Sequence, residues 1–84
     1  MLIYSKTLFA NGFSNAIVGY TDDGKIVYSK TKMVEVLISE EDMSLIDAIE
    51  HCEFNIWNSY VGEFTPIYVN DFDTDFELIE EYNA

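Results

Sequence analysis

The chain has 84 residues, of which 16 are aspartate or glutamate and four are lysine, with one histidine and no arginine, for a formal net charge of -12. Direct DNA or RNA binding needs cationic side chains that displace counterions from phosphates, so this balance argues against a nucleic-acid binder and against an anionic membrane surface. The length suits one domain with a small core. Because 49% of the residues are apolar and 15% are aromatic, we expect a folded chain and not a disordered one.

The sequence shows no secretion signal and no membrane span. No basic stretch followed by an apolar run opens it, and no apolar run approaches the ~18 residues that a span needs. The single cysteine, Cys52, cannot form an internal disulfide, which fits a reducing compartment. We therefore expect a cytoplasmic protein.

Charge is distributed unevenly along the chain. All four lysines lie in the first 32 residues, whereas residues 33–84 contain 14 acidic side chains and no lysine or arginine. Solvated surfaces ordinarily mix both signs, and repulsion between like charges destabilises the compact state. Solubility does not require such an excess, so we expect part of it to form a binding surface.

The first elements in chain order are a β-hairpin and a short helix. Residues 15–21 and 25–28 are rich in β-forming side chains and flank the turn residues 22–24. Ser29 then stands at the position of a helix N-cap, ahead of apolar residues at helical spacing. The alternation through residues 34–38 would also suit a strand.

A capping signal predicts a second helix from about residue 44 to residue 58. Ser44 and Asp47 form a capping-box-like pair, and Met43 is placed to pack against the first turns. We expect an apolar stripe toward the core, made of Leu45, Ala48, Ile49, Cys52 and Ile56. The other side carries Asp47, Glu50, His51 and Asn58, with Glu53 and Trp57 near the boundary and no lysine four residues away to pair the carboxylates.

The last part of the chain predicts a third strand and an acidic extension. Gly62 marks a break before residues 65–69, which read as a strand with Pro66 near its beginning. In residues 70–84, extended backbone would put Asp71, Asp73, Asp75 and Glu77 in a one-sided row, whereas a helix would be capped by Thr74. We favour an extended segment followed by one helical turn.

The predicted fold is therefore α+β. It is a single domain over residues 1–84, with a core fold in residues 1–69 and an acidic C-terminal extension in residues 70–84. A small antiparallel three-stranded sheet in β-β-α-α-β order packs against two helices.

No group of residues predicts catalysis or a metal site. The spacing of Asp71, Asp73 and Asp75 matches the start of a calcium loop, but Phe76 replaces the required glycine and Tyr82 the bidentate glutamate. His51 and Cys52 are adjacent and so point about 100° apart on a helix, which argues against a Cys-His nucleophile. We expect no enzyme, no cofactor and no metal.

An aromatic-rich stretch is the second candidate surface. Its members are Phe54, Trp57, Tyr60, Phe64 and Tyr68. A domain of this size needs most of its aromatic residues for burial. If Trp57 or Tyr60 is exposed beside Glu50, Glu53 and Glu63, it would anchor a charged interface.

Residues 53–69, EFNIWNSYVGEFTPIYV, end a helix with Glu-Phe-Asn and carry Tyr-Val-Gly-Glu and Thr-Pro before a last strand. In these features the chain resembles a family of small uncharacterised phage proteins. The resemblance extends back through residues 32–50 to the strand at residues 15–20, about two thirds of the chain. Asn58-Ser59 replaces the Gly-Ala that is usual in the family. The resemblance implies a β-β-α-α-β order and a viral origin, and phage proteins often act on host machinery.

Two functions are consistent with these observations. The first is an inhibitor of the anti-CRISPR, anti-restriction or repair-inhibitor type, which presents carboxylates in place of DNA or RNA phosphates to a basic, nucleic-acid-binding host protein. The alternative is a binding or structural phage module that docks through the aromatic stretch without mimicry. The candidate partner-binding residues are Asp47, Glu50, Glu53, Trp57, Tyr60, Glu63, Asp71, Asp73, Asp75 and Glu77.

Overall fold

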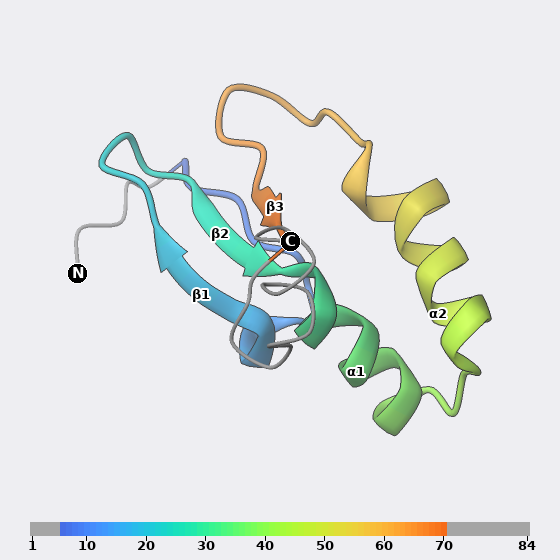
Figure 1. Ribbon diagram of the computed structural model, residues 1–84. Helices are drawn as coiled ribbons and strands as arrows, with labels where there is room; N and C mark the ends of the chain where they lie inside the picture. Colours follow the sequence, from blue (N-terminus) through green and yellow to red (C-terminus); the bar gives the residue numbers. More distant parts are fainter. Residues whose placement is uncertain (1–5, 71–84) are drawn as a thin grey trace, which may run out of the picture.

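The computed structural model describes residues 6–70, which form a three-stranded sheet with two α-helices beside it (Figure 1). In chain order the elements are η1 (Ser14–Ala16), β1 (Ile17–Tyr20), β2 (Ile26–Ser29), α1 (Lys30–Glu40), α2 (Leu45–Cys52), the π-helical turn η2 (Glu53–Trp57) and β3 (Ile67–Val69). The predicted α+β class and β-β-α-α-β order are confirmed. The predictions for the acidic extension fall on residues outside the described part, apart from Asn70.

The sheet has the order β1-β2-β3, with β2 in the centre. β1 and β2 pair antiparallel, as the hairpin predicts, whereas β3 runs parallel to β2, with Tyr68 opposite Tyr28. The prediction of an entirely antiparallel sheet is therefore wrong for β3. Both helices lie between β2 and β3 in the chain, and a connection of this length is a crossover that lets the third strand run in the same direction as the second.

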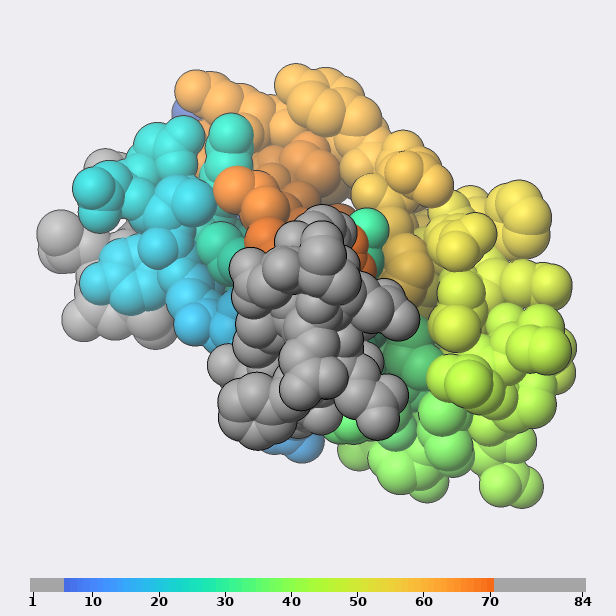
Figure 2. Space-filling model, viewed as in Figure 1, coloured from blue at the N-terminus to red at the C-terminus, as the bar shows by residue number. Residues whose placement is uncertain are grey.

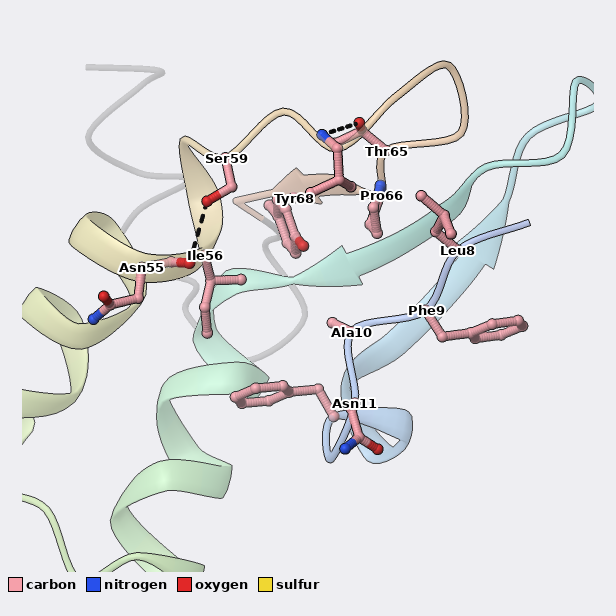
Figure 3. Close-up of a pocket in the computed structure, with 12 residues that line it drawn as sticks. Leu8, Phe9, Ala10, Asn11, Asn55, Ile56, Ser59, Thr65, Pro66 and Tyr68 are labelled. Carbon is pink, nitrogen blue, oxygen red and sulfur yellow. Dashed lines mark hydrogen bonds between the residues drawn. The ribbon is translucent and has the colours of Figure 1, made fainter. Parts of the chain in front are cut away.

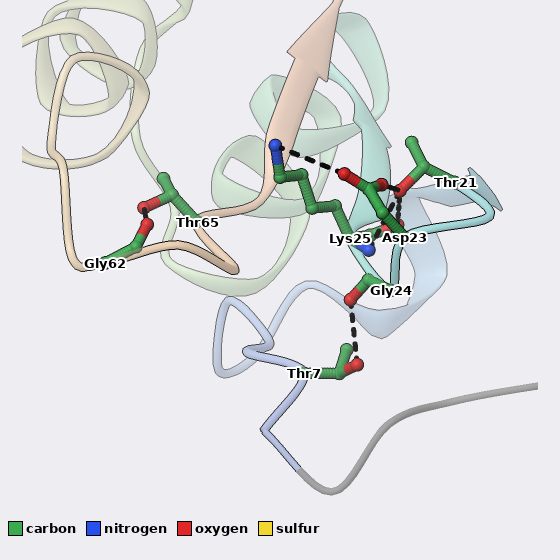
Figure 4. Close-up of polar contacts among 7 residues, drawn as sticks. All are labelled: Thr7, Thr21, Asp23, Gly24, Lys25, Gly62 and Thr65. Carbon is green, nitrogen blue, oxygen red and sulfur yellow. Dashed lines mark hydrogen bonds and ion pairs between the residues drawn. The ribbon is translucent and has the colours of Figure 1, made fainter.

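A polar network holds the hairpin turn (Figure 4). The Lys25 backbone N–H donates to Thr21 Oγ1 at 2.9 Å, and Gly24 takes the left-handed conformation that the turn requires, with φ +92°. The Thr21 hydroxyl donates to the Asp23 carboxylate, and mainly this bond lowers the pKa of Asp23, with Lys25 assisting. The Thr7 hydroxyl donates to the Gly24 carbonyl at 2.8 Å and so ties the N-terminal segment to the turn.

α1 begins directly at the end of β2. The buried Ser29 side chain accepts the Lys32 backbone N–H at 3.1 Å, so Ser29 is the N-cap that the sequence predicts. Met33, Val34 and Leu37 then face the core at helical spacing. The strand alternative for residues 34–38 is thereby ruled out.

α2 also begins where its sequence signal places it. Ser44 Oγ accepts the Asp47 backbone N–H at 3.1 Å, and Ala48 and Cys52 are fully buried. The predicted single helix to residue 58 is an α-helix only to Cys52, after which η2 continues the turn. The sequence places Leu45 in the core stripe, but its side chain is 58% exposed. The contact of α2 with the core is centred instead on Ala48 and Cys52, one and two turns later.

The core lies where the sheet meets the helices. Tyr28 is fully buried, its hydroxyl accepts the Ala10 backbone N–H at 2.8 Å, and its ring lies 5.7 Å from the ring of Tyr68, centroid to centroid. The buried hydrophobic residues are Phe13, Ala16, Ile26, Tyr28, Met33, Val34, Leu37, Ala48 and Cys52. Within residues 6–70, no helix is long and apolar enough to cross a membrane.

Candidate interaction surface

The outer side of α2 and η2 brings three predicted carboxylates together. Asp47, Glu50 and Glu53 are exposed and follow one another at three-residue intervals, turned away from the buried Ala48 and Cys52. None of the three forms an ion pair with any residue of the described part of the chain, and no lysine or arginine occurs after residue 32. We call Asp47, Glu50 and Glu53 the acidic face.

Two large apolar side chains share this side of the helix. Ile46 is 68% exposed and Phe54 is 80% exposed. Their positions, eight residues apart, fall opposite the buried Ala48 and Cys52, so helical spacing alone indicates that they are exposed. The expectation that the aromatic stretch is mostly core is therefore wrong for Phe54. Ile46 and Phe54 lie beside the acidic face, where exposed apolar side chains could anchor a partner.

Tyr60 extends this surface into the loop after η2, where it is 80% exposed, and Glu63 is exposed a few residues later. The loop is held by Thr65, whose hydroxyl accepts the Val61 backbone N–H at 3.0 Å. The same hydroxyl donates to the Gly62 carbonyl at 2.6 Å, as Figure 4 shows. Tyr60 is therefore exposed, as an anchor residue must be. In Figure 2, α2, η2 and this loop follow one another along one margin of the molecule.

Trp57 does not meet that condition. Its indole N–H donates to the sulfur of Met33 at 3.5 Å, and the ammonium of Lys30 lies 4.9 Å from the centroid of its ring. The side chain is half-buried between η2 and α1. Trp57 therefore lacks the exposure expected of an anchor, and its contacts join η2 to α1.

The remaining candidates, Asp71, Asp73, Asp75 and Glu77, lie outside the described residues. Within residues 6–70, no cluster of three or more histidine, cysteine, aspartate or glutamate side chains is placed to hold a metal ion.

His51 and Cys52 do not form a reactive pair. Asn55 Nδ2 lies 3.4 Å from His51 Nδ1 and also donates to the His51 carbonyl at 3.1 Å. Burial raises the pKa of the Cys52 thiol, so the buried sulfur stays protonated and is a poor nucleophile.

The molecule also carries an open apolar groove of about 430 Å³, the Tyr68 groove (Figure 3). Its apolar lining includes Leu8, Phe9, Phe13, Ile56, Pro66 and Tyr68. Burial, and then the neighbouring Tyr28 and Cys52, raise the pKa of Tyr68. No charged side chain of the described residues lines this groove, which therefore offers mainly packing surface.

Fold and surface together define a small α+β protein with an acidic helix face that carries exposed apolar side chains. No family model, curated protein or solved structure matches this chain. The resemblance to small phage proteins therefore stays a prediction.

Proposed function

We propose that the protein is an acidic inhibitor that binds a basic, nucleic-acid-binding protein by presenting carboxylates in place of phosphates. The observation that carries the proposal is the acidic face, whose three exposed carboxylates have no cation beside them in residues 6–70. Surface carboxylates without partners repel one another, and a basic surface relieves that repulsion.

The spacing of the acidic face supports mimicry of nucleic acid. A rise of 1.5 Å per residue in α2 separates Asp47 from Glu50 by about 4.5 Å along the helix axis, comparable to the ~3.4 Å of helix axis per phosphate on one strand of DNA. A channel that binds phosphates through lysine and arginine would accept carboxylates through similar charge-assisted hydrogen bonds. The net charge of -12 would also steer the protein toward such a channel at low salt.

The resemblance to phage proteins suggests where the inhibitor acts. A phage-encoded protein of this kind would work in the host cytoplasm, against a restriction, CRISPR or repair enzyme. Nothing in this proposal requires a cofactor or a catalytic group.

A second candidate function is a binding module that docks without mimicry. The specific observation in its favour is the exposure of Phe54 and Tyr60, since aromatic side chains are enriched at interface hot spots. Such a module would bury aromatic surface on its partner, and its binding would depend little on salt.

Capture from host lysate separates the two functions. The full chain is immobilised, bound proteins are eluted by salt or by duplex DNA, and each partner is then purified and its binding measured directly. The mimic predicts a basic nucleic-acid-binding partner that both eluents displace. Capture that resists salt, of a partner indifferent to DNA, contradicts mimicry and supports docking through Phe54 and Tyr60.

A further inference from the structure

A second groove, of about 410 Å³, lies between α1 and α2 and is distinct from the acidic face. We call it the Trp57 groove. Its apolar lining consists of Val34 and Ile38 from α1, Leu45 and Ile49 from α2, and Trp57 from η2.

Part of this apolar lining is left uncovered by the described residues. Leu45 is 58% exposed and Ile38 is 37% exposed, although both side chains face the space between the two helices. Apolar surface open to water is unfavourable in proportion to its area. A segment with apolar side chains would be stabilised by covering it.

We propose that the Trp57 groove is the docking site of residues 71–84 of the same chain. Asn70, the last residue that the structure describes, itself lines the groove, so the next residue starts there and no linker is needed. Fourteen residues can span at most about 50 Å, far more than docking in an adjacent groove requires. The proposal does not rest on the proposed function.

The chemistry of the segment fits the groove. It combines apolar and aromatic residues with six carboxylates, and its apolar members are Phe72, Phe76, Leu78, Ile79 and Tyr82. The groove supplies apolar surface and the Lys30 ammonium, which lies over the Trp57 ring. Phe72 and Phe76 would pack on the apolar lining, while the carboxylates at 71, 73 and 75 would face Lys30 or water.

Charge also favours this groove over the other surfaces of the helices. Its lining includes one cation, Lys30, and one carboxylate, Glu35, so it is close to neutral. The acidic face carries only carboxylates and would repel a segment with six more. A docked segment would place its outward carboxylates beside α2 and enlarge the negative surface there.

A spin label tests the proposal in the full chain. The label is attached at Glu80→Cys, with Cys52→Ala removing the native thiol, and the loss of methyl NMR signal is measured. We expect greater loss at Ile38, Leu45 and Ile49 than at Val61, which lines the Tyr68 groove instead. Equal loss, or none, overturns the proposal. Loss that appears only when labelled and isotope-enriched chains are mixed identifies a second copy as the occupant and overturns it too.

The fluorescence of Trp57, the single tryptophan, gives a second measurement with Cys52 in place. Replacing Phe72 and Phe76 together by serine is expected to shift the emission of Trp57 to the red and to increase its quenching by acrylamide. The control Thr74→Ala should leave both unchanged. Unchanged emission and quenching in the double variant overturn the proposal. The binding of an external partner is tested separately, with variants of the acidic face.

Discussion

The Lys30 ammonium lies 4.9 Å from the centroid of the Trp57 ring, and so a cation at the start of α1 contacts the π-helical turn that follows α2. The same indole donates its N–H to Met33, in the next turn of α1. These two contacts fix the packing of η2 against α1. They also explain why the exposed residues of this segment are Glu53, Phe54 and Asn55 rather than Trp57.

Removing the cation should weaken this contact. Lys30→Gln is expected to lower the free energy of unfolding by about 0.5–1 kcal/mol, the contribution of a partly exposed cation–π pair. Urea unfolding followed by circular dichroism measures the change. Lys6→Gln, at an exposed lysine outside the core, is the matched control. An equal effect of the two variants would show that the Lys30–Trp57 contact contributes nothing.

The N-cap of α2 gives a second prediction. Ser44→Ala removes the acceptor of the Asp47 backbone N–H and should cost about 1 kcal/mol of stability. Ser39→Ala, at an exposed serine near the end of α1, should stay within about 0.5 kcal/mol of the original chain. Thermal or urea unfolding compares the two. A Ser44→Ala variant as stable as Ser39→Ala would mean that the cap does not stabilise α2.

The exposure of Phe54 predicts tolerance to substitution there. Phe54→Ser should change the free energy of unfolding by no more than about 0.5 kcal/mol, because the side chain is 80% exposed and leaves no cavity. Phe13→Ala, at a buried phenylalanine, should cost about 3–5 kcal/mol. A strongly destabilised Phe54→Ser variant would place this ring in the core and remove it from the interaction surface.

Alkaline pH should destabilise the fold. Burial raises the pKa of Tyr28, Cys52 and Tyr68, so the folded chain holds these protons more tightly than the unfolded chain. Their stabilising contribution is therefore complete below about pH 9, the ordinary cysteine value, and is lost as the pH rises through the raised pKa values. Urea unfolding between about pH 8 and about pH 11 should show this decline.

Tyr68→Phe tests the origin of that decline, because it removes one of the three groups. The loss of stability with rising pH should become shallower in this variant, whereas Tyr20→Phe, at an exposed tyrosine, should leave it unchanged. An identical pH dependence in all three chains would show that Tyr68 does not contribute to it.

The local features of the fold could be predicted from the sequence, and the long-range ones could not. Ser29 and Ser44 cap their helices because capping depends only on the next three residues. The direction of β3 depends instead on how the two helices return the chain to β2, which no spacing in residues 65–69 encodes.

The candidate site likewise has features that the sequence predicts and features that it does not. Helical spacing places Asp47 and Glu50 of the acidic face away from the core, whereas it puts Glu53 only near the boundary, and the structure shows all three exposed. The half-burial of Trp57 could not be predicted, because its partners, Lys30 and Met33, lie on another helix far away in the sequence. The exposure of Phe54 follows from the same helical spacing, because the residue falls opposite Ala48 and Cys52, which the sequence places in the core stripe.

The central claim is that the placement of the acidic face, and not bulk charge, binds a basic partner. It is tested by two triple variants that remove the same number of charges. The first, Asp47→Asn with Glu50→Gln and Glu53→Gln, changes the acidic face. The second, Glu40→Gln with Glu41→Gln and Asp42→Asn, changes exposed carboxylates at the turn between α1 and α2, where asparagine tolerates the left-handed backbone of Asp42, with φ 56°.

The most direct measurement is the Kd of each variant for the captured nucleic-acid-binding protein, over a range of salt concentrations. The first variant should bind at least about tenfold more weakly, about 1.4 kcal/mol, with a smaller dependence on salt, while the second stays close to the original chain. Equal weakening of both variants would contradict the claim, because bulk charge would then account for the binding.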